Sequence, residues 1–252
     1  PISRKSFIRK IFDRLGYEVG RKGTTLNAMN VQESLIEGRE PVVFDVGAFD
    51  GSTTKRYREL FPFASIYSFE PFPETFEQLK INTAGEGSKT SLHNLAISDK
   101  KGVAVFNANA FSATNSLLPT DTDSSIYWGQ GVLETEKQVE VNTTTIDAFC
   151  DENAISKIDI LKLDVQGAEF SALMGAKEML SKQSISLVYL EVITAPTYQG
   201  QHKLHEIFNL FASFGYEFFD YYNPERKSRQ LIQADMIFVN KPLMQGLKEN
   251  LQ

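Results

Sequence analysis

The sequence predicts an α/β fold, a doubly wound and mostly parallel sheet with an antiparallel hairpin at its edge. Short apolar runs alternate with helix-compatible segments from residue 42 onward. The first run, Val42–Val46, is apolar at four of its five positions, which is typical of a strand buried on both faces. The last two runs, 216–222 and 234–239, have no helix between them, and this arrangement indicates a hairpin.

The segment before this alternation, residues 1–40, is predicted to be a helical cover. Apolar residues recur at helical spacing between Phe7 and Leu15, with basic residues among them, and a second short helix is expected over 25–37. Residues 1–23 carry a net charge of +5, against −6 for the whole chain. Two interpretations stay open. The first helix either lies on the domain with its basic face in solvent, or contacts a membrane surface or an anionic substrate.

The alternation defines a domain over residues 41–242, followed by a tail at 243–252. Before the hairpin, predicted strands cover 42–46, 66–69, 91–97, 158–163 and 187–192. Predicted helices cover 52–61, 74–82, 167–181 and 202–214. Residues 98–143 interrupt the pattern, and we expect a β-ribbon there with a long, mobile loop between its arms, such as a lid.

Composition and charge exclude several classes of protein. The 252 residues are 42% hydrophobic and 23% charged, which argues against a disordered or coiled-coil protein. No apolar run approaches the ~18–20 residues that span a membrane. After residue 23 the net charge is −11, so we expect no nucleic-acid partner. The single cysteine, Cys150, suits a reducing cytoplasm, and we interpret it as an inert, packed thiol.

The strongest local signal is the turn after the first strand, Asp45-Val46-Gly47-Ala48-Phe49-Asp50-Gly51. Its glycines permit a tight turn and a close approach to a ligand at the carboxyl end of a parallel strand. Glu70 ends the second strand and suits a ribose diol, and Phe72 suits a purine face. A dinucleotide fingerprint would need glycine where Phe49 stands. The pattern therefore favours a nucleoside without phosphate, such as S-adenosylmethionine.

These blocks resemble the FkbM-type S-adenosylmethionine-dependent methyltransferases. The matching segments are 42–51, 67–71, 95–99 and, most specifically, 160–169. The resemblance implies a Rossmann-like class I methyltransferase fold with seven strands. It also implies methylation of a hydroxyl group, most often on a sugar of a glycan, polysaccharide or glycosylated metabolite. The chain departs from the family where it has Gln166 in place of the common Glu, and Phe49 in place of the common Asn.

The resemblance also implies a set of cofactor-binding residues. Their assigned places are Asp45, Gly47 and Gly51 at the methionine end, Glu70 at the ribose, and Leu95 and Ala96 at the adenine. Ala48 and Pro71 belong to the same blocks, and Phe72, directly after the second block, completes the predicted cofactor site.

Three carboxylates are predicted to converge beside the transferred methyl group. Asp164 and Glu191 end neighbouring strands, and Glu169 begins a helix. In one interpretation they bind Mg²⁺ or another divalent cation that acidifies the acceptor hydroxyl. In the other, Asp164 acts as general base without a metal, and Glu169 complements the helix dipole. His202 and His205, in the first turn of a predicted helix, are further candidate bases.

Two other functions stay open at this point. One is an NAD- or nucleotide-sugar-dependent enzyme on a Rossmann-like fold, and the other is a non-catalytic module that binds the cofactor. The acids at the strand ends favour an enzyme whose partner is a small-molecule or glycan acceptor with a free hydroxyl. In the long loop, Tyr127 and Trp128 either stack on that sugar or anchor the loop to the core.

Overall fold

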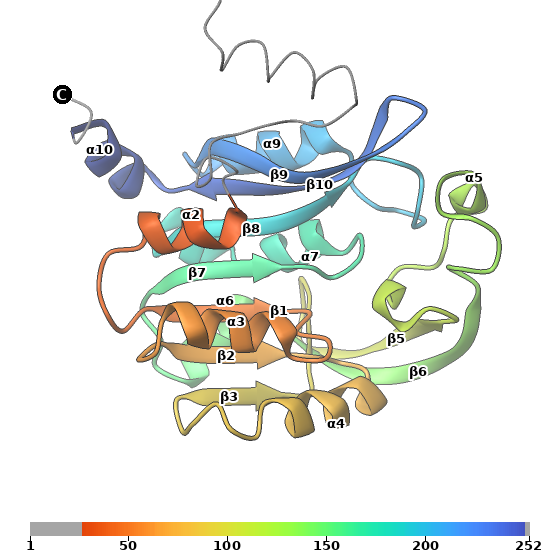
Figure 1. The fold of residues 1–252 in the computed structure, drawn as a ribbon, viewed down its shortest axis with the longest axis horizontal. Helices are drawn as coiled ribbons and strands as arrows, with labels where there is room; N and C mark the ends of the chain where they lie inside the picture. Colours follow the sequence, from red (N-terminus) through yellow and green to blue (C-terminus); the bar gives the residue numbers. More distant parts are fainter. Residues whose placement is uncertain (1–26, 250–252) are drawn as a thin grey trace, which may run out of the picture.

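The structure is a computed structural model that describes residues 27–249. Within this range the large sheet is made of β1 (Val42–Val46), β2 (Ser65–Phe69), β3 (Thr90–His93), β7 (Ile158–Leu163), β8 (Ile185–Ile193), β9 (Glu217–Lys227) and β10 (Gln230–Val239). The strands lie in the order β3-β2-β1-β7-β8-β10-β9 (Figure 1). The first five are parallel, and β10 is antiparallel to both neighbours. The predicted sheet with its edge hairpin is confirmed.

Helices cover both faces of this sheet (Figure 1). One face packs against α2 (Ala28–Leu35), α3 (Ser52–Leu60) and α10 (Lys241–Glu249). The other packs against α6 (Ile146–Glu152), α7 (Glu169–Met174), α8 (Lys177–Ser181) and α9 (Leu204–Ser213). A further helix, α4 (Pro73–Asn82), connects β2 to β3. Because successive side chains of a strand point to opposite faces, each buried strand supplies apolar residues to both layers.

On the face covered by α2 and α3, the apolar rows end in polar side chains. Val43 is followed on this face by Asp45, and Ile160 by Lys162. The strand register pairs Asp45 with Lys162, and Lys162 with Tyr189. The sheet therefore places charged and hydroxyl-bearing side chains of three neighbouring strands side by side near their carboxyl ends.

The insertion forms a second sheet beside the carboxyl ends of the large sheet's strands (Figure 1). Its strands are β4 (Ala96–Ile97), β5 (Gly102–Asn109) and β6 (Thr135–Thr144), in the order β4-β6-β5. β5 and β6 pair antiparallel, as the predicted ribbon requires. The loop between them carries two short helices, η1 (Ser112–Thr114) and α5 (Ser124–Trp128), and is therefore more structured than predicted.

The third predicted strand, 91–97, is interrupted. Asn94 turns out of β3, and its side-chain amide donates to the carbonyl oxygens of Glu70 and Pro71, both at 2.9 Å. The chain then crosses to the second sheet, where Ala96–Ile97 forms β4. A polar side chain that bonds to the neighbouring backbone competes with the ladder, and this local competition ends the strand.

Three helix boundaries also differ from the prediction. The helix over 167–181 is two helices, separated at Gly175, where a Cβ would lie 2.1 Å from the carbonyl oxygen of Ser98. The helix over 202–214 begins at Leu204. The predicted tail at 243–252 begins inside α10, whose apolar side chains pack on the α2 face.

The remaining structural expectations concern the termini and the cysteine. The basic helix predicted between Phe7 and Leu15 lies outside the described residues, so its role stays a prediction. Across residues 27–249, no helix has both the length and the apolar character needed to cross a bilayer. Cys150 is buried, and burial, with Asp147 and Asp151 nearby, raises the pKa of its thiol to about 12. This agrees with an unreactive, packed side chain.

Candidate active site

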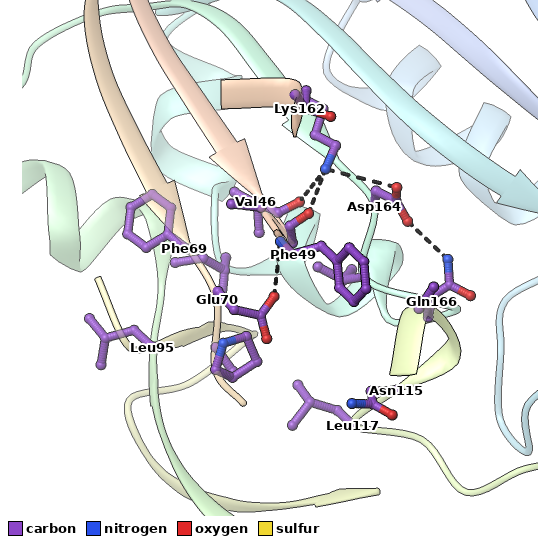
Figure 2. Close-up of a pocket in the computed structure, with 18 of the residues that line it drawn as sticks. Val46, Phe49, Phe69, Glu70, Leu95, Asn115, Leu117, Lys162, Asp164 and Gln166 are labelled. Atoms are coloured by element: carbon purple, nitrogen blue, oxygen red, sulfur yellow. Dashed lines mark hydrogen bonds and ion pairs between the residues drawn. The ribbon is translucent and has the colours of Figure 1, made fainter. Parts of the chain in front are cut away.

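A cavity, named here the first cavity, opens at the carboxyl ends of β1, β2 and β7 (Figure 2). Six predicted cofactor residues line it: Gly47, Ala48, Glu70, Pro71, Leu95 and Ala96. Its opposite wall comes from the insertion, through Phe106, Ser112, Ala113, Asn115 and Leu117. The insertion thus supplies a complete wall of this cavity, whereas the sequence predicted only a loop that covers the site.

The turn between β1 and α3 brings its backbone to the edge of the first cavity. Gly47 has φ +74°, and a Cβ there would lie 1.8 Å from the carbonyl oxygen of Asp164. Only glycine combines this backbone angle with such a close approach. Gly51, at φ +86°, instead faces α4, where a Cβ would lie 2.6 Å from Thr83. Gly51 therefore shapes the turn without lining the cavity, which corrects its predicted contact with the cofactor.

Glu70 is the buried acid of the first cavity. Its Oε2 accepts the backbone N–H of Phe49 at 3.1 Å, and its Oε1 accepts that of Phe72 at 2.9 Å. Both oxygens are therefore fixed, and each keeps a lone pair for a further donor. Burial outweighs these hydrogen bonds and raises the pKa of Glu70 to about 7. A carboxylate held in this way can accept hydrogen bonds from both hydroxyl groups of a ribose diol.

Two other predicted cofactor residues lie behind the cavity wall. Phe72 is buried and stacks on Phe106, with ring centroids 6.2 Å apart. Asp45 is fully buried, and its Oδ2 accepts the Thr54 hydroxyl at 2.7 Å. Neither side chain lines the first cavity. Their predicted direct contact with the cofactor is corrected to a supporting position. Asp45 is covered by α3 through Thr54, and Phe72 is packed against Phe106 of the second sheet.

Lys162 is the functional residue that sequence reasoning missed. Its Nζ lies 3.1 Å from Oδ1 of Asp45 and 3.8 Å from Oδ2 of Asp164, and it donates to the carbonyl oxygen of Gly47 at 2.7 Å. Burial opposes the ammonium charge, but the attraction of Asp45 and Asp164 outweighs it and raises the pKa of Lys162. The signal was a lysine within an apolar strand, Ile158–Leu163, since a buried charge requires a partner.

A second cavity adjoins the first, over β8, β9 and β10. The two share four lining residues: Ser52, Thr53, Lys162 and Asp164. The other residues of the second cavity are mostly polar: Met29, Arg56, Leu163, Tyr189, Glu191, Asn223, Glu225, Gln233 and Asp235. The side chain of Asp164 is 42% exposed. Asp164 thus presents an accessible carboxylate on the wall between the two cavities.

Gln166 fixes this carboxylate, a role that the sequence did not indicate. Its Nε2 donates to Oδ1 of Asp164 at 2.9 Å and to Oε2 of Glu191 at 2.7 Å (Figure 2 shows the contact with Asp164). Its Oε1 accepts the hydroxyl of Tyr198 at 3.0 Å. Burial, followed by the nearby Asp164 charge, raises the pKa of Glu191. The amide therefore separates two carboxylates that would otherwise repel each other directly.

The third predicted metal ligand, Glu169, is turned away from this pair. Its Oε1 accepts the backbone N–H groups of Val165 and Gly167, at 2.9 and 3.3 Å. Burial raises the pKa of Glu169 to about 7. Residues 27–249 contain no group of three or more His, Cys, Asp or Glu side chains placed to hold a metal ion. The predicted set of Asp164, Glu169 and Glu191 is not assembled, because Glu169 caps its own turn.

The two histidines predicted as candidate bases are not brought to Asp164. His202 precedes α9 and stacks on Phe170, with ring centroids 3.7 Å apart and nearly parallel planes. His205 is exposed on α9. Neither residue lines the first or second cavity. The prediction assumed that both histidines lie on one helical turn at the mouth of the site, but the helix begins two residues later than predicted.

Trp128 anchors the long loop to the core. Its indole N–H donates to the hydroxyl of Thr197 at 2.7 Å. Its ring packs against a small apolar cluster that contains Leu133, Ile193 and Tyr198. Of the two interpretations left open for this residue, the contacts favour the anchor over sugar stacking.

We expect Trp128→Phe to lower the free energy of unfolding by about 1–3 kcal/mol, because the smaller phenyl ring leaves part of the space of the indole unfilled and one hydrogen bond is lost. Urea denaturation measures this change, with the exposed neighbour Ile126→Ala as control. The positions of the first and second cavities do not depend on this hydrogen bond, so ligand binding there should stay within twofold of the parent. Weakened ligand binding with unchanged stability would contradict the anchoring role.

The sequence of this chain matches one protein family and is similar to three methyltransferases. The family model described as "Methyltransferase FkbM domain" matches residues 45–218. The 2-O-methyltransferase NoeI of Sinorhizobium fredii is 32% identical over 189 residues, which is 72% of this chain and 75% of that protein. The hexuronic acid methyltransferase AglP of Haloferax volcanii is 24% identical over 158 residues, covering 61% of this chain and 56% of that protein. The 31-O-demethyl-FK506 methyltransferase FkbM of Streptomyces tacrolimicus is 26% identical over 156 residues, covering 54% of this chain and 60% of that protein.

Proposed function

Because the chain belongs to the FkbM methyltransferase family, we propose that it transfers the methyl group of S-adenosylmethionine to a hydroxyl group of a sugar. The chain is an S-adenosylmethionine-dependent O-methyltransferase. Two relatives support the sugar as acceptor, since one is described as a 2-O-methyltransferase and the other as a hexuronic acid methyltransferase. An NAD- or nucleotide-sugar-dependent enzyme and a non-catalytic module are not favoured.

The observation that carries the proposal is the position of Asp164 between the two cavities. The first cavity has the features that hold S-adenosylmethionine. The Gly47–Ala48 backbone borders the methionine end, Glu70 accepts the ribose hydroxyls, and Leu95 with Ala96 gives an apolar wall for the adenine. The second cavity is then left for the acceptor, with Asp164 at the boundary.

S-adenosylmethionine, when bound, supplies an activated methyl group, so the chain has to align the acceptor and remove its proton. We assign proton removal to Oδ2 of Asp164. Oδ1 of the same carboxylate is held by Gln166, and Nζ of Lys162 lies 3.8 Å from Oδ2. A hydroxyl group is a weak nucleophile at neutral pH, and a carboxylate within hydrogen-bond reach makes it more reactive.

We propose that this step uses the carboxylate rather than a divalent cation. The Gln166 amide occupies the space between Asp164 and Glu191 with a hydrogen-bond donor, and Glu169 is committed to its own turn. The three carboxylates predicted to bind a cation, Asp164, Glu169 and Glu191, therefore do not face one common position among the described residues. Initial rates measured with EDTA and with added Mg²⁺ should agree within twofold, and a strict Mg²⁺ requirement would overturn this part of the proposal.

The cofactor assignment is tested by calorimetric titration with S-adenosylmethionine and S-adenosylhomocysteine. We expect Glu70→Ala to weaken binding at least tenfold, while Glu77→Ala, an exposed acid on α4, leaves the Kd unchanged. The pKa of Glu70 in the protein without ligand is about 7. Affinity for S-adenosylmethionine should therefore fall as the pH is lowered from 8.5 to 6, because the carboxylate takes up a proton. The variant should lack this pH dependence.

Either of two results would contradict the cofactor assignment. The first is equal affinity in the parent and Glu70→Ala. The second is that the parent binds neither ligand while NAD or a nucleotide sugar does bind, which would also overturn the proposed methyl transfer.

A further inference from the structure

The second cavity is lined by more acidic than basic side chains. Four acids line it, at positions 164, 191, 225 and 235, against two basic side chains, Arg56 and Lys162. Both basic groups are already paired. Lys162 is held by the buried Asp45, and Arg56 lies 2.8 Å from the carboxylate of Glu59. An occupant of this cavity therefore meets acids whose charge is not balanced from within the cavity.

The hydrogen-bonding groups of the cavity are arranged to receive donors. Oδ2 of Asp235 accepts both the Tyr189 hydroxyl and the Asn223 side-chain amide, each at 2.7 Å. Oε2 of Glu191 accepts from Gln166. In the part of the chain that the structure describes, the second oxygen of each of these carboxylates accepts no hydrogen bond, although both residues line the cavity. Hydroxyl groups can donate to such oxygens, whereas a carboxylate, sulfate or phosphate group cannot.

The surroundings of two of these acids disfavour negative charge. Burial, together with the charge of Asp164, raises the pKa of both Glu191 and Asp235. Lys162 lowers both pKa values but does not offset the increase. The negative charge of an anionic sugar would enter the same surroundings, where burial and the charge of Asp164 disfavour it.

From this geometry, and on the premise of the proposed sugar O-methylation, we infer that the second cavity binds the acceptor and selects a sugar ring without negative charge. Asp235 and Glu191 accept hydrogen bonds from ring hydroxyls. Glu225, exposed at the rim, repels anionic sugars. In this respect the inferred acceptor differs from the hexuronic acid in the name of AglP.

The test compares sugars that differ only in charge. Initial rates of radiolabelled methyl transfer from S-adenosylmethionine are measured for paired p-nitrophenyl glycosides, glucoside with glucuronide and galactoside with galacturonide. We expect transfer to a neutral glycoside to exceed transfer to its uronide at least tenfold. Glu225→Lys should shift this ratio toward the uronide at least threefold. Glu217→Lys, which makes the same charge change on β9 at a residue that does not line the cavity, should leave the ratio unchanged.

The outcomes separate this inference from the proposed function. Faster transfer to a uronide than to its neutral partner overturns the inference and leaves sugar O-methylation intact. An unchanged ratio in Glu225→Lys overturns the assignment of the second cavity to the acceptor. Transfer to none of the glycosides, with S-adenosylmethionine bound as measured by calorimetry, overturns both the inference and the proposed acceptor.

Discussion

Asp164→Asn should lower kcat by a factor of about 10²–10⁴, the range expected when a general base is removed. The amide has nearly the same shape as the carboxylate but cannot take a proton from the acceptor. Asp164 lies at the boundary of the first cavity, and Glu70 and the Gly47 turn are unchanged. The Kd for S-adenosylmethionine should therefore stay within about threefold. Single-turnover rates and calorimetry on the same preparation separate the two effects.

The control for this variant is Glu191→Gln, which removes the second acid of the pair but keeps a hydrogen-bonding side chain. We expect a smaller loss of kcat there, since Glu191 has a raised pKa and its Oε2 is held by Gln166. If Asp164→Asn kept a rate within threefold of the parent while Glu191→Gln lost activity, the base would be Glu191 and the assignment to Asp164 would be wrong.

Lys162→Met should lower the free energy of unfolding by about 3–5 kcal/mol, because it leaves the carboxylate of Asp45 buried without its cationic partner. Asp45 is fully buried and keeps only the hydroxyl of Thr54 as a side-chain donor among the described residues. The loss is measured by urea denaturation monitored by circular dichroism. The turn at Gly47 also loses a donor to its carbonyl oxygen, so affinity for S-adenosylmethionine should fall as well.

The double variant Asp45→Asn with Lys162→Met shows how much of the loss in unfolding free energy comes from the unpaired charge of Asp45 and how much from lost packing of the Lys162 side chain. Replacing both members of a buried ion pair is often close to neutral, whereas removing one is costly. We therefore expect the double variant to recover most of the stability that Lys162→Met loses. A single variant that costs less than about 1 kcal/mol, or a double variant no more stable than the single, would show that the pair does not hold this part of the sheet.

The sequence by itself determined the order of the strands and helices and the edge of the sheet where ligands bind. Continuous apolar runs such as Val42–Val46 and Ile158–Leu163 required strands buried on both faces, hence a parallel sheet with helices on each side. Glycines after the first strand and an acid after the second then predicted a nucleoside site above β1 and β2, where the first cavity opens. The four matching segments, of which 160–169 is the most specific, indicated the family, and the matched domain confirms it.

The sequence did not determine which of two polar neighbours faces the cavity. Asp45 and Glu70 both lie at or beside strand ends, yet Asp45 is sealed behind the wall by Thr54 and Lys162, whereas Glu70 lines the cavity. The difference depends on strand register and on the helix packed above the strand. Both are set by contacts between residues far apart in the chain, which local spacing does not encode.

The same reason explains why the sequence did not indicate the role of Gln166, the second cavity or the positions of the two histidines. Gln166 bridges Asp164 to Glu191, which stand 27 residues apart in the chain. The second cavity gathers side chains from α2, α3, β8, β9 and β10. Periodicity assigns each side chain to a face of its own element. Only the tertiary packing decides which faces meet, and therefore which acids share a cavity and how negative that cavity is.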